Sequence, residues 1–392
     1  MHEHKQNQCK RKVKHRKNVM GLIIFCITVG IAFMFTYYQN LRKEISVRQK
    51  WLETVLTGEK KWILENQGPE GEIYMNGSKA GDVNPYFACM AALGLLAETK
   101  NCPMTETEQK AVGRYLDWHT GVLLETDGKM GIYRKESGKL IYKEKVDSED
   151  GYLGMYLFLM GKYLEKTENT DLPEYWKKGI SLALKKIQSL MQDGITQVSE
   201  ENTTAYLMDN MEVWKGLYEL EPAGLKDVQV ISEMRKKIQE QIEKIFWDDA
   251  NQRWRIIGNS DLYHQAEFYP DGVAQIYPLI YEFPVKEKKK QKVLYDQFTE
   301  RFQWQKLNKK RTGFLWAMTG MAAAQMGDIN NLVELVGNYE TEYCENRKYP
   351  LYTGEAGWIC MECEKLYGLY ERKIKTGFIP VSYTHLTLPT IL

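Results

Sequence analysis

Residues 147–164 read DSEDGYLGMYLFLMGKYL, with three carboxylates in four residues leading directly into an apolar segment. Asp147 or Ser148 suits the N-cap of a helix, and Asp150 then falls in the first turn, where the positive end of the helix dipole favours a carboxylate. The same order of polar loop, aromatic residue and apolar helix begins six times, near residues 84, 147, 202, 270, 312 and 354. The sequence therefore predicts six related helix starts.

Longer and more highly charged helices alternate with these six. The spacing of apolar residues predicts them at 41–65, 106–119, 174–191, 228–246, 287–302 and 329–339. Short hairpins are expected at 130–142 and 246–257. Six helix pairs that each bury one face against their neighbours can close into a ring with the apolar set inside. We therefore expect an all-α (α/α)6 toroid of six helical hairpins, occupying residues 41–375.

An uncharged stretch near the N-terminus, VMGLIIFCITVGIAFMFTYY at 19–38, has about the 20 residues that a helix needs to cross a bilayer. It predicts a transmembrane anchor at 19–40 that follows a basic tail at 1–18. A cleaved signal peptide is the alternative, but its apolar region is usually shorter and ends at small residues. The positive-inside rule then leaves the tail in the cytoplasm and the main domain outside. The expected location is the cell membrane, with a single pass and an uncleaved signal-anchor.

Composition excludes several classes of function. The formal net charge is +1, and because lysines and arginines crowd residues 5–17, the rest of the chain is mildly acidic and gives no support for nucleic-acid binding. Cys360 and Cys363 form a Cys-x-x-Cys pair without a second pair at ligand spacing. HExxH, Walker A and Gly-x-Ser-x-Gly patterns do not occur. We therefore expect no metal and no cofactor.

Five motifs stand at the inner helix starts: VNPYFA at 83–88, DSEDGYLG at 147–154, YLMDN at 206–210, FYPDGVAQ at 268–275 and EAGW at 355–358. With the helix alternation, they make residues 45–372 resemble the six-hairpin glycosidase superfamily. The resemblance implies an (α/α)6 toroid that acts on carbohydrate. It is one of architecture and motif style, so it assigns no catalytic residue.

In a toroid whose inner helices start on one side, their first residues surround one mouth of a central cavity. Glycoside cleavage requires two carboxylates there, and flat aromatic rings suit the faces of sugars. The candidate catalytic residues are Asp150, Asp271, Glu355 and Asp147, with Asp150 paired across the ring with Asp271 or Glu355. The candidate substrate-binding residues are Asn84, Tyr86, Tyr152, Asp209, Asn210, Trp214, Tyr269, Trp316 and Trp358.

Each of these residues also has a structural explanation. Asp147, Asp271 and Glu355 all occupy positions where capping or the helix dipole alone favours an acidic residue. Asp209 and Asn210 lie inside a helix although neither is a good helix former, so they serve either the cavity or a buried hydrogen bond. Trp316 and Trp358 fit core packing as well as sugar stacking.

Residues 381–390, VSYTHLTLPT, resemble the translation of a sequencing adapter. We therefore treat 381–392 as an artefactual tail and exclude it from functional reasoning, with a natural β-strand as the alternative.

The sequence as a whole predicts a membrane-anchored, extracytoplasmic glycoside hydrolase-like protein that binds a polysaccharide or oligosaccharide and uses carboxylate acid and base catalysis. A non-catalytic glycan-binding or scaffold toroid, and a polysaccharide lyase, are the alternatives.

Overall fold

The computed structural model describes residues 2–77, 81–136, 139–168, 172–258, 260, 267–307 and 313–376. The chain divides into two compact units. Residues 52–369 form one unit, and the described residues before 52 and after 369 belong to the other. The tail at 381–392 lies outside the described residues, so its interpretation stays a prediction.

Twelve α-helices occur in the described part of the chain, and their even and odd members differ as expected. The even-numbered helices are α2 (Pro85–Leu96), α4 (Glu149–Thr167), α6 (Leu207–Leu220), α8 (Val273–Ile280), α10 (Thr319–Met326) and α12 (Thr353–Thr376). The odd-numbered helices are α1 (His2–Glu65), α3 (Glu106–Glu125), α5 (Glu174–Leu190), α7 (Val228–Phe246), α9 (Lys288–Phe302) and α11 (Ile329–Tyr339). Four short helical turns are η1 (Glu221–Ala223), η2 (Phe268–Gly272), η3 (Trp304–Lys306) and η4 (Glu340–Cys344).

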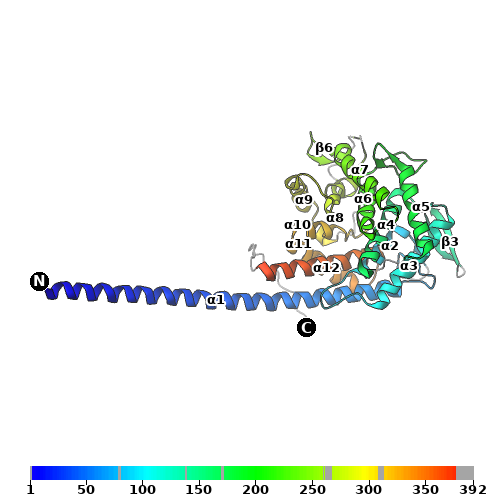
Figure 1. The fold of residues 1–392 in the computed structure, drawn as a ribbon. Helices are drawn as coiled ribbons and strands as arrows, with labels where there is room; N and C mark the ends of the chain where they lie inside the picture. The colour runs from blue at the N-terminus through cyan, green and yellow to red at the C-terminus, as the bar shows by residue number, and fades with distance from the viewer. Residues whose placement is uncertain are drawn as a thin grey trace. The chain divides into compact units, whose positions relative to one another are not determined.

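The even-numbered and odd-numbered helices differ in how much of their surface is buried. Helix α4 is buried almost continuously from Asp150 to Leu164, as in a helix surrounded by others. Helix α7 instead buries a single stripe that recurs every three or four residues, which is typical of a helix with one face on the core: Ile231, Met234, Ile238, Ile242 and Phe246. Figure 1 shows α4, α6 and α8 in the interior of this unit and α5, α7 and α9 at its periphery.

The even-numbered helices form a closed ring. Helix α2 packs on α4, α4 on α6, α6 on α8, and α8 on α10. Glu362 of α12 lies against Gly320 of α10, and α12 meets α2 where a Cβ on Gly94 would be 2.4 Å from the Cα of Gly357. The predicted (α/α)6 toroid is therefore confirmed, and α6 stands opposite α12 in the order of the ring.

The contact between α2 and α12 gives a stability prediction. A Cβ on Gly357 would lie 2.1 Å from the carbonyl oxygen of Met90, a backbone atom that cannot move without its helix. We expect Gly357→Ala to lower the free energy of unfolding by about 1–3 kcal/mol, as overpacking does. Gly337→Ala in α11 is the control, because its Cβ would meet nothing within 4 Å and alanine favours a helix. Thermal unfolding of both variants checks this, and equal melting temperatures would contradict it.

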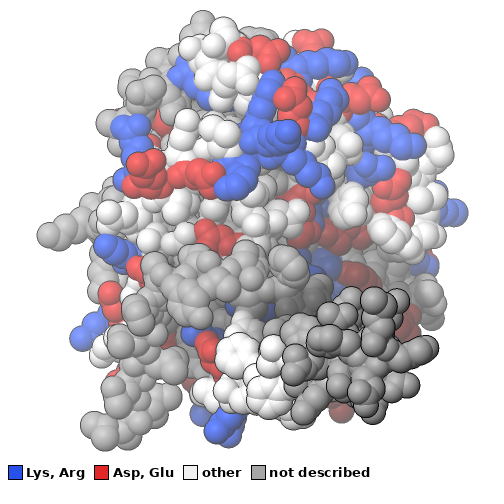
Figure 2. All heavy atoms as spheres, turned by 90° about the vertical axis from the view of Figure 1, so that its left-hand side faces the viewer, with Lys and Arg blue, Asp and Glu red and all other residues white. Residues whose placement is uncertain are grey.

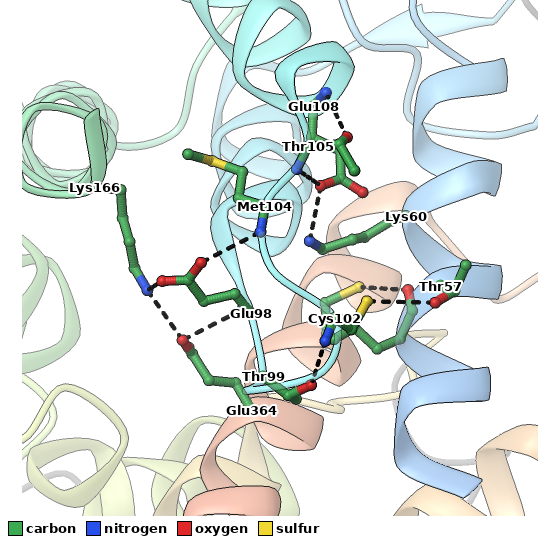
Figure 3. Close-up of polar contacts among 12 residues, drawn as sticks. Thr57, Lys60, Glu98, Thr99, Cys102, Met104, Thr105, Glu108, Lys166 and Glu364 are labelled. Atoms are coloured by element: carbon green, nitrogen blue, oxygen red, sulfur yellow. Dashed lines mark hydrogen bonds and ion pairs between the residues drawn. The ribbon is translucent and has the colours of Figure 1, made fainter. Parts of the chain in front are cut away.

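Ion pairs connect neighbouring inner helices near the end of the ring at which these helices finish. Lys215 of α6 and Lys365 of α12 both bind Glu282, which follows α8, at 3.0 and 2.5 Å. Burial opposes ionisation of Glu282, but the two lysines outweigh it and lower its pKa to about 2. Figure 3 shows a second set, in which Lys166 at the end of α4 binds Glu98 and Glu364. The cavity described below lies at the other end, where the inner helices begin.

Short β-strands occur in the segments that connect the helices. β1 (Asp82–Val83), β2 (Gly131–Glu136) and β3 (Lys139–Lys145) form one antiparallel sheet in that order. β4 (Met191–Gln192) pairs with β5 (Ile195–Thr196), and β6 (Trp247–Asp248) pairs with β7 (Arg253–Trp254). The hairpins expected at 130–142 and 246–257 are confirmed, although the turn residues 137 and 138 lie outside the described residues.

Two inner helices begin later than predicted. Helix α6 starts at Leu207 rather than near Asn202, because Tyr206 forms a β-bridge with Ile257 and holds the preceding residues extended. Helix α10 starts at Thr319 rather than near residue 312. There the backbone N–H groups of Trp316 and Ala317 donate to the side chain of Glu355 instead of entering a helix.

The smaller unit contains one helix that is long and apolar enough to cross a membrane. Within residues 20–65 of α1, an 18-residue window has a mean hydropathy of 2.2, and none of that window is buried. Within this unit the hydroxyl of Tyr38 donates to the carbonyl oxygen of Ile374 at 3.4 Å. Arg48 donates to the hydroxyl of Tyr370 at the same distance.

Candidate active site

A cavity of about 670 Å³ opens among the starts of the inner helices. All its lining residues belong to the unit of residues 52–369. They combine carboxylates with aromatic and methionine side chains: Met75, Asp82, Asn84, Tyr86, Phe87, Met90, Ile132, Glu144, Lys145, Asp147, Ser148, Gly151, Tyr152, Met208, Asp209, Glu212, Tyr269, Tyr277, Phe314, Trp316, Met318, Glu355 and Trp358.

One wall of the cavity carries two carboxylates from α6. Asp209 and Glu212 are three residues apart on this helix, so they share a face. Both approach α4 at Gly151, where an added Cβ would lie 2.8 Å from Oε2 of Glu212 and 3.5 Å from Oδ1 of Asp209. Glycine at the start of α4 therefore makes room for Glu212, whereas a Cβ there would only touch Asp209 at an ordinary contact distance.

Glu212 is held by tyrosines. The hydroxyls of Tyr277 and Tyr281 donate to its Oε1 at 2.6 and 3.3 Å, and the Tyr86 hydroxyl donates to the same atom. Burial raises the pKa of Glu212 to about 7, although these hydroxyls favour the ionised form. The three donors, from α2, α8 and the residue that follows α8, fix the orientation of this carboxylate.

Asp209 is the second acid on this wall, and its pKa is also raised. Burial raises its pKa well above the usual value, and the nearby charges of Asp150 and Glu212 raise it further. Its side chain is nevertheless only half-buried and lines the cavity. A carboxyl group whose pKa is raised and that faces a cavity has the properties of a proton donor.

Glu355 supplies the opposite wall. It lies in the first turn of α12, and its carboxylate accepts from the backbone N–H groups of Trp316 at 3.1 Å and Ala317 at 2.8 Å. Burial raises the pKa of Glu355 to about 7 against the effect of these donors. Its partners belong to another segment of the ring, so helix capping does not account for it. Glu355 of α12 therefore lines the same cavity as Asp209 and Glu212 of α6, the helix opposite α12 in the order of the ring.

The backbone that holds Glu355 is unusual. Trp316 has a φ of 58°, in the left-handed region that non-glycine residues rarely adopt. Such a conformation costs about 1–3 kcal/mol and is concentrated at functional sites. Here it accompanies two consecutive N–H groups that both bind one carboxylate.

Aromatic rings surround the space between the carboxylates. The rings of Tyr269 and Trp316 lie 4.7 Å apart at 34°, and the side chain of Tyr269 is 44% exposed. Phe87 and Phe314 stack at 5.6 Å. These flat surfaces beside buried acids suit a ligand with both apolar faces and polar edges.

The structure brings most of the predicted residues to this cavity. The lining contains Asp147, Glu355, Asn84, Tyr86, Tyr152, Asp209, Tyr269, Trp316 and Trp358. It does not contain Asp150, Asp271, Asn210 or Trp214.

Asp150 and Asn210 do not line the cavity, but their hydrogen bonds hold the elements that do. Asp150 is fully buried and accepts from Thr196 Oγ1 at 2.6 Å and from Ser148 Oγ at 2.8 Å. Asn210 holds the same threonine by its backbone, accepting from its N–H at 2.7 Å and donating to its carbonyl at 3.0 Å. Together they tie the starts of α4 and α6 to β5. Burial raises the pKa of Asp150 to about 6.

The other two face the protein interior. Asp271 is 1% exposed in η2, and its carbonyl oxygen accepts from the side chain of Gln275. Trp214 packs between Tyr218 and Phe283, and its indole N–H donates to Gln239 on α7.

Sequence reasoning missed Glu212 and Tyr277. Glu212 stands three residues after Asp209, so helical periodicity would have placed it on the same face. Tyr277 has no local signal, because its role depends on Glu212 of another helix. Over the described ranges, no three His, Cys, Asp or Glu side chains are arranged to hold a metal ion.

Neither a protein-family model nor a curated protein sequence matches the chain. Solved structures do match. A glycosidase in complex with glucose is 11% identical with a TM-score of 0.59, over 83% of this chain and 99% of that chain. An inactive variant of the alpha-1,6-mannanase GH76A of Salegentibacter sp. HEL1_6, in complex with alpha-1,6-mannotriose, is 10% identical with a TM-score of 0.50, over 81% and 99%. A novel alpha-amylase from Clostridium perfringens is 12% identical with a TM-score of 0.52, over 80% and 97%. The chain therefore has the six-hairpin glycosidase-like fold that the sequence motifs predicted.

Proposed function

We propose that this protein is a glycoside hydrolase whose acid and base are Asp209 and Glu355. The observation that supports this most directly is that a half-buried carboxyl group on α6, Asp209, and a buried one on α12, Glu355, both line an open, aromatic-lined cavity. Asp209 protonates the oxygen of the scissile glycosidic bond as that bond breaks. Glu355 removes a proton from the water that attacks the anomeric carbon from the other face. Acid and base on opposite walls leave room for that water, as inversion requires.

Glu212 and Asp150 serve this chemistry without contacting the reacting atoms. Burial is the main cause that raises the pKa of Asp209, and their negative charges raise it further, in the direction that an acid needs. The tyrosine hydroxyls on Glu212 hold its charge at a fixed position behind Gly151. Catalytic sites often contain two carboxyl groups whose different environments give them different pKa values, so that one is protonated while the other is ionised.

The substrate class is an oligosaccharide or polysaccharide. The open cavity separates this proposal from a scaffold toroid, whose ring would be filled by side chains. Glucose and alpha-1,6-mannotriose occupy two of the structures that share the fold, which supports sugars in this chain as well. The test is release of reducing ends from a panel containing alpha-1,6-mannan, alpha-glucans and bacterial cell-surface glycans. Turnover of none of them would count against the hydrolase.

We infer the cellular location of the protein from its N-terminal segment. The basic tail and apolar helix support a single-pass anchor in the cell membrane, with the tail in the cytoplasm and the glycan-binding unit outside. When the chain is expressed in cells, hydrolase activity should sediment with the membranes and become soluble when residues 1–41 are deleted. Protease added to intact cells should cut the unit of residues 52–369, and its full protection would contradict this topology.

A further inference from the structure

Aromatic rings continue from the wall of the cavity to the protein surface. Phe314 and Phe87 line the cavity, and the ring of each lies 5.6 Å from that of Tyr352. The ring of Tyr352 in turn meets that of Tyr349 at 6.0 Å, edge to face. Neither tyrosine lines the cavity. The series of rings therefore leads out of the cavity and ends at Tyr349.

The same series begins inside the site. The ring of Trp316 lies 6.2 Å from that of Phe314 and 4.7 Å from that of Tyr269. Tyr269, Trp316, Phe314, Tyr352 and Tyr349 thus form one continuous set, which we call the aromatic run. Its two ends are exposed, Tyr269 by 44% and Tyr349 by 72%, and the three residues between them are half-buried.

Tyr349 is the most exposed large hydrophobic residue that the structure describes in the unit of residues 52–369. Single exposed apolar side chains are common on protein surfaces and need no function. Tyr349 differs because it ends a run of rings that starts in the cavity, and because its position is held. Gly313 has a φ of 77°, and a Cβ there would lie 2.9 Å from the hydroxyl oxygen of Tyr349. Contacts with Gly313 and Tyr352 therefore orient a ring that stays largely exposed.

An aromatic run of this kind suits a chain of sugars. Sugar rings have apolar faces that stack on aromatic rings and polar edges that do not. Five rings offer more surface than one sugar can cover, and the outermost ring lies beyond the cavity. The run also differs from the described surface in Figure 2, where lysine and arginine are interspersed with aspartate and glutamate. A ligand that uses the whole run must extend out of the cavity.

Resting on the proposed function, we propose that the substrate is a polysaccharide whose chain continues from the cavity past Phe314 and Tyr352 to Tyr349. The bond to be cleaved lies at the acids of the cavity, and a sugar further along the chain stacks on Tyr349. Tyr349 is then a binding residue that distinguishes long chains from short ones. Because this contact is the same before and during the reaction, its loss should raise KM and leave kcat unchanged.

Binding of oligosaccharides of increasing length tests this. The full-length chain carrying Glu355→Gln, in detergent micelles, is titrated with dimers, tetramers and octamers while tryptophan fluorescence is followed. Three neutral series are used: α-1,6-linked mannose, α-1,4-linked glucose and β-1,4-linked N-acetylglucosamine. In a series that binds, we expect the octamer to bind at least fivefold more tightly than the dimer, since a contact between aromatic rings is worth about this factor.

Three further variants locate the effect. Adding Tyr349→Ala should weaken binding of the octamer about fivefold and binding of the dimer by less than twofold. Tyr349→Phe keeps the ring and should keep the affinity for the octamer. Tyr218→Ala is the control, because Tyr218 is 47% exposed in the last turn of α6, at the end of the ring away from the cavity. It should leave both affinities as they were.

Several results would overturn the proposal: equal binding of dimer and octamer, equal weakening of both by Tyr349→Ala, no weakening of either, or binding in none of the series. Hydrolysis by the chain with Glu355 intact separates this proposal from the proposed function. Length-dependent binding through Tyr349 without turnover would count against the hydrolase alone. Turnover of a polysaccharide with a KM that Tyr349→Ala leaves unchanged would overturn the extended site alone.

Discussion

Replacement of Glu355 by glutamine should abolish hydrolysis almost completely, with kcat/KM falling by about 10³-fold. Glutamine preserves the size of the side chain, and its single amide oxygen can still accept from one of the two N–H groups, of Trp316 or Ala317, that now donate to separate oxygens of Glu355. It cannot accept a proton from water, so the variant loses general base catalysis and keeps its fold. Initial rates of reducing-end release from the best glycan of the panel measure the effect.

The control is Glu364→Gln, two and a half turns further along α12. Glu364 binds Lys166 at 3.2 Å and does not line the cavity, so the same chemical change there should leave kcat/KM within about twofold. Retention of more than about a tenth of the activity by Glu355→Gln would exclude Glu355 as the base.

The pH profile of the unmodified protein follows from the same residue. A base must be ionised, and burial raises the pKa of Glu355 to about 7. Activity should therefore fall as the pH drops below about 7, because Glu355 becomes protonated. Loss of activity at high pH should require ionisation of Asp209, whose pKa is raised well above its usual value. The site thus works in a window near or above neutral pH.

Much of the fold could be predicted because its determinants are local. The continuous burial of α4 and the single stripe of α7 both appear as patterns within one helix. Six apolar helices that alternate with six charged ones have few ways to bury their surfaces, and a ring is one of them. The late start of α10 was beyond prediction, because the segment before it is shaped by Glu355, nearly 40 positions away.

The site was less predictable because it depends on which way each side chain points. Asp147 and Asp150 are near neighbours in sequence, yet Asp147 lines the cavity while Asp150 turns inward to Thr196. The difference arises because Asp147 precedes the helix and Asp150 is in its first turn. The proposed pairing of Glu355 with an acid on α6 depends on the closing of the whole ring, which no pattern within one helix can predict.

Replacement of Asp209 by asparagine should lower kcat/KM on the natural glycan by about 10²–10³-fold, because asparagine cannot donate a proton to the leaving oxygen. A glycoside with a dinitrophenyl leaving group needs no such proton. Its hydrolysis should therefore be nearly normal in Asp209→Asn and strongly impaired in Glu355→Gln. Asp127→Asn, on a turn where the side chain is 86% exposed, is the matched control and should resemble the unmodified protein.

Thermal stability separates this role from a structural one. Because the pKa of Asp209 is raised in the folded state, its ionisation at high pH opposes folding, so its stabilising contribution is present at low pH and is lost as the pH rises. Asparagine does not ionise, so Asp209→Asn should melt at the same or a higher temperature than the unmodified protein at pH 8. A lower melting temperature together with equal losses on both substrates would mean that Asp209 holds the fold. In that case Glu212, three residues along α6, would become the acid to test.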